Sequence, residues 1–235
     1  MALIDDLNND VSSILSNNWS IRDGQVVPFS DQVTLGGGAV RLEATMLYAD
    51  LADSTELAMN FDRRVAAKVF KSFLTCSSRI IRACGGEIRS FDGDRVMGIF
   101  LGPLKNTSAA KCALNINYAF TEIVKRRLEA RYPQLGTDYD LAHCVGVDTS
   151  DVLVVRGGVV NNNDLVWVGR APNVAAKLSG LREPEYHSFI TAAVYNKMQE
   201  NIKISPDGQP MWEQRSWNAV EGVNRIYRSS WWWKP

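Results

Sequence analysis

Apolar positions along the chain recur at helical or strand spacing, and turn residues separate the segments. In residues 2–18 apolar side chains lie three and four positions apart, which predicts a short amphipathic helix that packs on a partner surface. A continuously apolar strand is expected at Leu42–Asp50. A helix is expected at Phe61–Cys84, where Gly85-Gly86 closes the pattern.

A β-hairpin is predicted directly after that helix. Its strands are Glu87–Phe91 and Val96–Leu101, and Asp92-Gly93 is typical of a type I′ turn. Asp94 is therefore expected at or beside the tip of the hairpin. A second long helix is predicted at Ser108–Arg131.

Further strands and one helix follow in the second half of the chain. Strands are expected near Tyr139–Val147 and Val152–Val155, and Leu165–Val168 leads into a helix with Pro172 in its first turn. His143, within an apolar strand, is expected to be a hydrogen-bonded core residue. The order of elements predicts an α+β fold of the ferredoxin-like βαββαβ type, with extra C-terminal strands and an N-terminal helix.

Composition excludes several classes of function. The 26 basic and 26 acidic residues balance, so no net charge attracts nucleic acid or an anionic membrane. The N-terminus is acidic where a secretory signal is basic, and no stretch is apolar for the ~20 residues of a membrane span. These features predict a cytoplasmic protein without a membrane partner. The four cysteines lack metal-ligand spacing and are expected to be structural thiols.

Two aspartates are candidates for a metal site. Asp50 ends the buried strand and Asp94 lies on the predicted hairpin, and these strands are neighbours in a ferredoxin-like sheet. Both carboxylates can then converge on hard divalent cations, and backbone amides of the turn at 51–55 can hold phosphate oxygens. Taken alone, an aspartate at a strand end is also typical of a cap, and Asp-Gly-Asp of an ordinary hairpin.

Three segments together resemble the signature motifs of one family. They are Asp50-Leu51-Ala52-Asp53-Ser54-Thr55, Phe91-Asp92-Gly93-Asp94-Arg95-Val96-Met97 and Gly169-Arg170-Ala171-Pro172-Asn173-Val174-Ala175-Ala176-Lys177-Leu178. In order and spacing they are similar to the motifs of class III nucleotidyl cyclases, from about Leu42 to Met198. The resemblance implies an N-terminal helical segment and connector at 1–38 and a catalytic domain at 39–235. It also implies a head-to-tail homodimer with active sites at the interface and a requirement for two Mg²⁺ or Mn²⁺ ions.

The resemblance assigns roles to individual residues. Asp50, Asp94 and the carbonyl of Leu51 would bind the metal ions. Asn173 matches the asparagine that orients the ribose, and Lys177 takes the place of the arginine that stabilises charge on the α-phosphate; both would come from the partner protomer. Further contacts with the substrate are implied for Ser54, Thr55, Ser90, Val166 and Arg225.

The positions that read the base differ from those of purine cyclases. Adenine-specific relatives have a lysine and an aspartate where this chain has Ser90 and Val166, and the glutamate and cysteine that read guanine are also absent. Side chains expected to narrow the pocket or to donate to a base carbonyl are Tyr48, Phe91, Trp167, Arg89 and Arg95. The pattern is similar to pyrimidine cyclases of bacterial Pycsar-type anti-phage defence. It predicts conversion of UTP into 3′,5′-cyclic UMP, which a separate effector protein would read.

Three alternatives stay open at this point. The substrate is CTP if the pocket presents the reversed donor and acceptor pattern, and the chain is an adenylate cyclase if ATP is used. A degenerate regulatory domain that binds a nucleotide without turnover is favoured by Lys177, which lacks the planar fork of arginine. The presence of Asp50, Asp94 and Asn173 argues against that reading. Asp53 is a further departure, because many relatives have glycine there.

Overall fold

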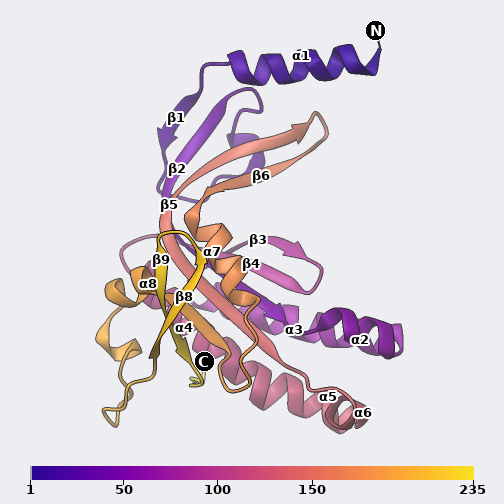
Figure 1. The fold of residues 1–235 in the computed structure, drawn as a ribbon, viewed down its shortest axis with the longest axis vertical. Coiled ribbons are helices and arrows are strands. Elements are labelled where there is room, and N and C mark those ends of the chain that lie inside the picture. The colour runs from indigo at the N-terminus through magenta and orange to yellow at the C-terminus, as the bar shows by residue number, and fades with distance from the viewer. Residues whose placement is uncertain (1) are drawn as a thin grey trace. The chain divides into compact units, whose positions relative to one another are not determined.

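The structure is a computed structural model that describes residues 2–235. The chain divides into two compact units, one formed by residues up to 43 and 151–169, the other by 44–150 and 170–235. Strands β2 (Gly38–Leu51) and β5 (His143–Val159) run through both units (Figure 1). No helix within the described residues has the length and apolar character to cross a membrane.

The smaller unit contains helix α1 (Leu3–Ser16), which confirms the predicted N-terminal helix. Strand β1 (Ser20–Asp23) pairs in parallel with the start of β2. Strand β6 (Asn162–Gly169) pairs antiparallel with the end of β5. The short 3₁₀ turn Ser30–Gln32 completes this unit. None of the residues of α1 is buried.

The larger unit is built on a sheet with the strand order β3-β4-β2-β5-β7-β9-β8. The strands not yet introduced are β3 (Glu87–Asp92), β4 (Arg95–Phe100), β7 (Ser188–Thr191), β8 (Glu213–Val220) and β9 (Val223–Ser229). β4 is antiparallel to both β2 and β3, whereas β5 and β7 are parallel. The order β5-β2-β4-β3 is that of a ferredoxin-like sheet and confirms the predicted fold class.

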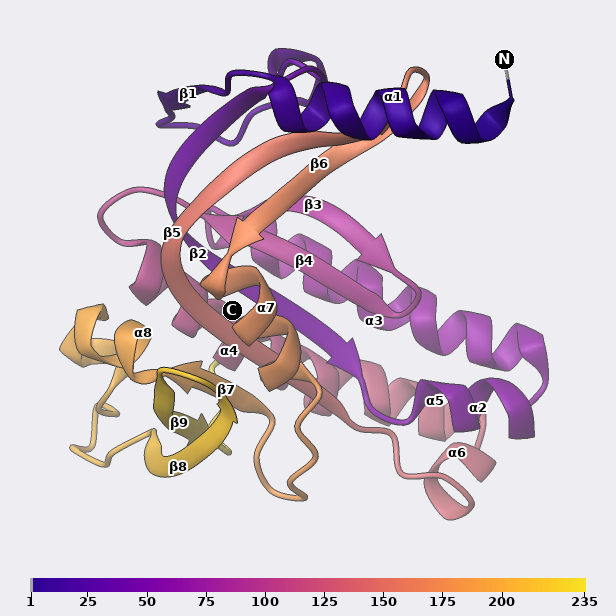
Figure 2. The ribbon, with the colours of Figure 1, turned by 45° about the horizontal axis from the view of Figure 1, so that its top comes forward.

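Helices cover the sheet of this unit on both faces. They are α2 (Ser54–Asn60), α3 (Arg63–Ala83), α4 (Lys105–Ala119), the π-helical turn η2 (Phe120–Lys125), α5 (Arg126–Arg131), α6 (Gln134–Thr137), α7 (Arg170–Ser179), α8 (Ala192–Lys197) and the 3₁₀ turn η3 (Glu200–Ile202). Figure 2 shows α3 and α4 behind the sheet and α7 in front of it.

Strand alternation determines which side chains each face receives. Leu47, Ala49 and Leu51 of β2 belong to the large core under α3 and α4. Cys144 of β5 lies in a separate cluster with Leu178 of α7. Because neighbouring residues of a strand point to opposite faces, Asp50 lies on the face away from α3 and α4.

Several predicted boundaries are wrong, among them those of α3 and β5. The helix expected at Phe61–Cys84 starts at Arg63, and Asp62 caps it by accepting a hydrogen bond from the Arg64 amide at 2.8 Å. The separate strands expected at Tyr139–Val147 and Val152–Val155 are one continuous strand, β5. The polar residues between them change the burial of the strand without interrupting its backbone.

The tryptophan-rich C-terminus packs along α4. Asn115 and Asn117, both buried in that helix, donate hydrogen bonds from Nδ2 to the carbonyls of Trp233 at 2.7 Å and Trp231 at 2.9 Å. The ring of Trp232 lies 5.1 Å from that of Tyr118, centroid to centroid. The tail therefore satisfies polar groups that α4 would otherwise bury unpaired.

Candidate functional site

The two predicted metal-binding aspartates lie at adjacent strand ends. Ala49 of β2 pairs with Val96 of β4, so the next residue of β2, Asp50, is beside the start of β4. The Nε of Arg95 is 3.7 Å from Oδ1 of Asp50. Asp94 precedes Arg95 in the turn of the β3–β4 hairpin, so the convergence expected from the fold is present.

The hairpin turn differs from the prediction. Asp92 pairs with Arg95, so the two central residues are Gly93 and Asp94. Gly93 has φ of +61°, but Asp94 is not in the positive-φ region. A type I′ turn needs positive φ at both central residues, whereas type II′ needs it only at the first, where glycine is favoured. Asp94 therefore lies within the tip.

Burial and the neighbouring charged groups shift the pKa of Asp50. The pKa of Asp50 is raised to about 6: burial is the largest cause, the neighbouring Asp94 carboxylate acts in the same direction, and Arg95 and Arg182 act in the opposite direction. Oδ2 of Asp94 is buried and has no hydrogen-bond partner in the described chain. Two neighbouring carboxylates that are partly buried are stabilised by a bound cation, which neutralises their charge.

Sequence reasoning missed Arg182, which follows α7. Its Nη2 donates a hydrogen bond to the Leu51 carbonyl at 3.3 Å and lies 3.8 Å from Oδ2 of Asp50. Its Nε lies 4.0 Å from Asp53. A guanidinium thus faces the oxygens that the resemblance assigned to a metal ion. No motif pointed to this residue, because its position depends on where the loop after α7 turns.

The backbone of the turn between β2 and α2 explains why many relatives have glycine at the position of Asp53. Asp53 has φ of 52° and ψ of 30°, the left-handed region that glycine adopts most easily. The Tyr139 hydroxyl donates to the Ala52 carbonyl at 2.6 Å, which holds the turn in place. Ser54 is half-buried and Thr55 exposed in the first turn of α2.

Helix α7 presents Asn173 and Lys177 to the outside. The two residues are four positions apart, so they share one face, and both are exposed. The opposite face, with Val174 and Leu178, is buried. Pro172 stands in the first turn, as predicted. This orientation makes both polar side chains available to a second protomer.

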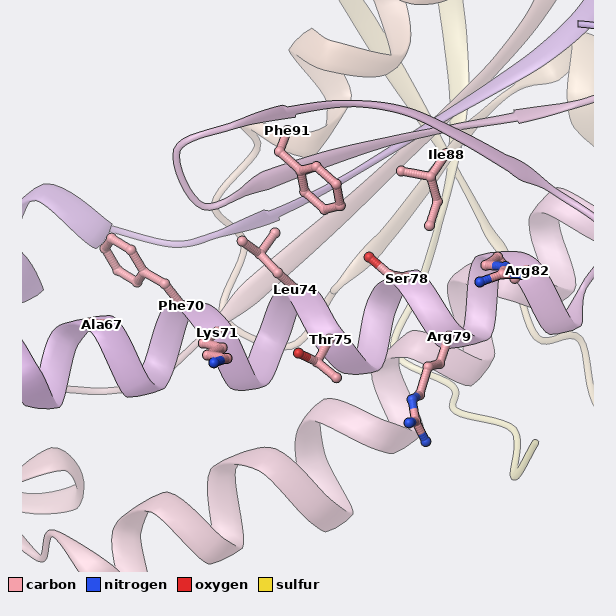
Figure 3. Close-up of a pocket in the computed structure, with 10 residues that line it drawn as sticks. All are labelled: Ala67, Phe70, Lys71, Leu74, Thr75, Ser78, Arg79, Arg82, Ile88 and Phe91. Carbon is pink, nitrogen blue, oxygen red and sulfur yellow. The ribbon is translucent and has the colours of Figure 1, made fainter.

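Ser90 and Phe91 point to opposite sides of β3. Ser90 pairs with Met97 and lies on the sheet face that carries Asp50. A register shift between Ile88 and Ser90 places Ile88 and Phe91 together on the other side, against α3 (Figure 3). The suggestion that Phe91 narrows the nucleotide pocket is therefore wrong.

The remaining predicted contacts are spread over the chain. Val166 and Trp167 lie on β6 in the smaller unit, and Val166 is exposed. Arg225 is exposed on β9, opposite Ser216 of β8. Strands β5 and β7 lie between β2 and β9, so Arg225 is not beside Asp50 in the same protomer.

The donor set fits a hard divalent cation. Asp50, Asp94 and the carbonyl of Leu51 offer only oxygen atoms, which Mg²⁺ and Mn²⁺ prefer. Among residues 2–235 no three or more histidine, cysteine, aspartate or glutamate side chains are arranged so that they could hold a metal ion by themselves. A site made of two carboxylates and one backbone carbonyl is consistent with that finding. All four cysteines are free thiols.

His143 is buried, as expected, but neither ring nitrogen has a hydrogen-bond partner in the described chain. Its ring is stacked on that of His187 at 5.1 Å and lies 4.3 Å from the Phe120 ring. Burial, followed by the charge of His187, holds the pKa of His143 well below its usual range. The prediction is thus right about the burial of His143 and wrong about the hydrogen bonds of its ring.

Comparison with known proteins gives full-length relatives. The chain is 47% identical over 237 residues to a uridylate cyclase from Rhodovulum sp. (strain MB263), covering 100% of this chain and 99% of the relative. It is 40% identical over 235 residues to uridylate cyclases from Xanthomonas perforans and Burkholderia cepacia, covering at least 99% of each chain. No model of a protein family matches.

Solved structures show the same fold at lower identity. A bacterial light-regulated adenylyl cyclase matches with a TM-score of 0.69 at 23% identity, over 83% of this chain and 53% of the other. The adenylyl cyclase CyaB from P. aeruginosa matches with a TM-score of 0.65 at 22% identity, over 81% of this chain and 95% of the other. This chain has the class III nucleotidyl cyclase fold and belongs to the family of the uridylate cyclases.

Proposed function

We propose that this enzyme converts UTP into 3′,5′-cyclic UMP and pyrophosphate. The 3′-oxygen of the ribose forms a bond to the α-phosphorus, the bond from that phosphorus to the α,β-bridging oxygen breaks, and the 3′-hydroxyl proton passes to solvent. The observation that carries the proposal is the convergence of the Asp50 and Asp94 carboxylates in a chain with full-length uridylate cyclase relatives.

Each protomer contributes two sets of residues in this proposal. Asp50, Asp94 and the Leu51 carbonyl would hold two Mg²⁺ or Mn²⁺ ions, which when bound neutralise phosphate charge and make the 3′-hydroxyl more acidic. Asn173 of the second protomer orients the ribose. Lys177 of the second protomer places its ammonium at the α-phosphate oxygen, where negative charge grows during the reaction.

The triphosphate and the base are held by the other predicted residues. Ser54 and Thr55 in the first turn of α2 contact phosphate oxygens, and Arg225 of β9 contacts the terminal phosphates. Ser90 and Val166 take the positions that face the base. Val166 offers no acceptor for the adenine amino group, so ATP would leave that group unpaired, which disfavours it.

A donor for a uracil carbonyl is available beside the metal ligands. The guanidinium of Arg95 lies 5.9 Å from the centre of the Tyr48 ring, and the alternation of β2 and β4 places both on the face that carries Asp50. Uracil presents O4 as an acceptor, whereas cytosine presents a donor at that position. This supports UTP over CTP.

Turnover of the four triphosphates tests the substrate. Purified protein is incubated separately with UTP, CTP, ATP and GTP in the presence of Mn²⁺, and the products are separated by chromatography. Cyclic UMP is expected as the main product. Cyclic CMP as the main product would move the assignment to cytidylate cyclase, cyclic AMP alone would contradict a pyrimidine enzyme, and no cyclic product would favour a regulatory domain.

The proposal extends to the role of the product. Cyclic UMP would be made in the cytoplasm as a second messenger of anti-phage defence, and a separate effector protein would bind it. A rise in cellular cyclic UMP after phage infection of a strain that carries this gene is the expected result.

A further inference from the structure

A groove of about 600 Å³ lies between helix α3 and strand β3 (Figure 3). Phe70, Leu74 and Ser78 follow one another at intervals of four residues and form its floor along one row of α3. Ile88 and Phe91 of β3 form the opposite wall. The volume lies within the range of ~300–1,000 Å³ that is usual for small-molecule sites.

The end of the groove near Phe91 is apolar and open to water. Phe91 as a whole residue is 58% exposed, although its ring faces α3. Figure 3 shows it directed toward Leu74, with Phe70 beside that residue. An apolar group placed between these side chains would remove their surface from water.

The other end of the groove is positively charged. Arg79 and Arg82 lie there, a third cation, Lys71, lies beside Phe70 near the opposite end (Figure 3), and no acidic residue lines the groove. Within residues 2–235 none of these three cations forms an ion pair. A ligand that complements this end carries a negative charge.

A buried hydroxyl between the two ends lacks a partner. Oγ of Ser78 is inaccessible to water and makes no hydrogen bond within the described chain. Figure 3 shows this hydroxyl directed toward β3, between Leu74 and the arginine end. A ligand oxygen could accept a hydrogen bond from it only after the side chains that cover it move aside.

We propose that this groove binds a small amphipathic anion, with its apolar body against Leu74 and Phe91 and its acidic head at Arg79 and Arg82. The site is separate from the proposed nucleotide site, because β3 turns Ser90 to its opposite side. The ligand would contact the same strand that leads to Asp94. Such a site adds a binding function that is independent of cyclase turnover.

Calorimetric titration of the full-length protein with sodium decanoate below its micelle concentration tests the proposal, without metal ion or triphosphate. Saturable binding of one decanoate per chain is expected. The uncharged methyl decanoate is expected to bind about tenfold more weakly or worse, because it cannot pair with the arginines.

Variants locate the binding. The double variant Arg79→Gln/Arg82→Gln is expected to weaken decanoate binding about tenfold or more, and Phe91→Ala to weaken it as well. Arg127→Gln/Arg131→Gln on α5 removes the same charge from another surface and should leave the affinity unchanged. Thermal unfolding of each variant verifies that it folds.

Three results would overturn the proposal. They are equal binding of decanoate by the two double-arginine variants, equal binding of decanoate and methyl decanoate, and binding to phosphatidylglycerol vesicles without any binding of monomeric decanoate. The last result would identify a membrane surface in place of a small-molecule site.

Discussion

Asp50 is placed where its charge is unfavourable for the fold in the absence of a cation. Its pKa is raised to about 6, mainly by burial and then by Asp94. Since the folded state prefers the neutral acid, the unfolded chain releases this proton at lower pH than the folded chain does. Ionisation of Asp50 therefore lowers the free energy of unfolding as the pH rises through about 6.

The variant Asp50→Asn separates function from stability. At pH 8 without metal ions it is expected to unfold at a higher temperature than the natural chain, because the amide has no charge to desolvate. It is also expected to form no detectable cyclic nucleotide, because one of the proposed metal ligands is lost. Thermal unfolding and product chromatography measure the two effects.

Asp92→Asn is the matched control for that experiment. Asp92 belongs to the same hairpin and is exposed, but it is not a predicted ligand. It should retain turnover. A loss of activity in Asp92→Asn as large as that in Asp50→Asn would show that any charge removed from this hairpin has the same effect.

His143 gives a second prediction at the residue scale. In the unfolded chain this histidine takes up a proton near pH 6.5, whereas burial keeps it neutral in the folded chain. Its contribution to stability is therefore lost as the pH falls below about 6.5. His143→Phe removes two unpaired ring nitrogens and is expected to raise stability at pH 7.5 by about 1–3 kcal/mol.

Urea unfolding at pH 7.5 and pH 5.5 checks this prediction. The drop in unfolding free energy between the two pH values should be smaller in His143→Phe than in the natural chain. Part of the drop should remain, because burial also lowers the pKa of His187. Identical drops in both proteins would contradict the assignment.

Several residues could be predicted from the sequence and others could not. The adjacency of the strand ends that carry Asp50 and Asp94 could be predicted, because these strands are neighbours in any ferredoxin-like sheet. Arg182 was not found, because long flexible side chains reach their partners through loop geometry that no local pattern encodes. Phe91 was placed on the wrong side, because it was assigned to the same pocket as Ser90 although neighbouring residues of a strand point to opposite faces.

At the scale of elements, α7 depends on one glycine of β5. A Cβ added to Gly146 would lie 2.2 Å from the Ala175 carbonyl oxygen and 2.4 Å from the Ser179 nitrogen, both in the backbone of α7. The helix can approach the strand this closely only because glycine has no side chain. The position of Asn173 and Lys177 thus depends on Gly146.

Gly146→Ala is expected to destabilise the protein by about 1–3 kcal/mol or more, because the helix backbone must move. Cyclase activity should fall further than stability explains, since α7 carries two proposed catalytic side chains. Denaturant unfolding and turnover under conditions where the variant is fully folded measure the two effects.

Gly36→Ala is the control, because no atom lies within 4 Å of a Cβ at that position. It should change neither stability nor turnover. Full activity of folded Gly146→Ala would show that the exact position of α7 is unimportant for turnover.

Elements were predicted in the right order, but their boundaries were less certain. The apolar spacing of residues 108–131 predicted one helix, and the structure instead has α4, the π-helical turn η2 and α5 in succession. The π-helical turn contains one more residue than an α-helical turn and so shifts the buried face of the helix by one position. The spacing of apolar residues over this length does not reveal such a shift. The continuity of β5 was missed because its burial changes along the strand although its backbone is unbroken.

The whole molecule is proposed to work as a dimer whose sites each combine two protomers. Asp50→Asn and Asn173→Ala proteins should each be inactive alone. Mixed and allowed to exchange subunits, they should recover about a quarter of the natural activity, because half of the dimers are mixed and each mixed dimer has one complete site.

Recovery of activity is measured as cyclic UMP formed over time, at several ratios of the two variants. Mixing two preparations of the same variant is the control and should yield nothing. No recovery after proven subunit exchange would contradict active sites shared between protomers.

Arg182 links the end of α7 to the end of β2, which belong to different active sites in the proposed dimer. Its Nη1 donates hydrogen bonds to the carbonyls of Ser179 and Leu181 at 3.0 Å, while its Nη2 holds the Leu51 carbonyl. The Leu51 carbonyl is also a proposed metal ligand, so Arg182 would lose this hydrogen bond, and with it the link between the end of α7 and β2, if that oxygen bound a metal ion. In the proposed dimer α7 serves the active site of the partner protomer, so metal binding at one site would change how firmly this helix is held at the other.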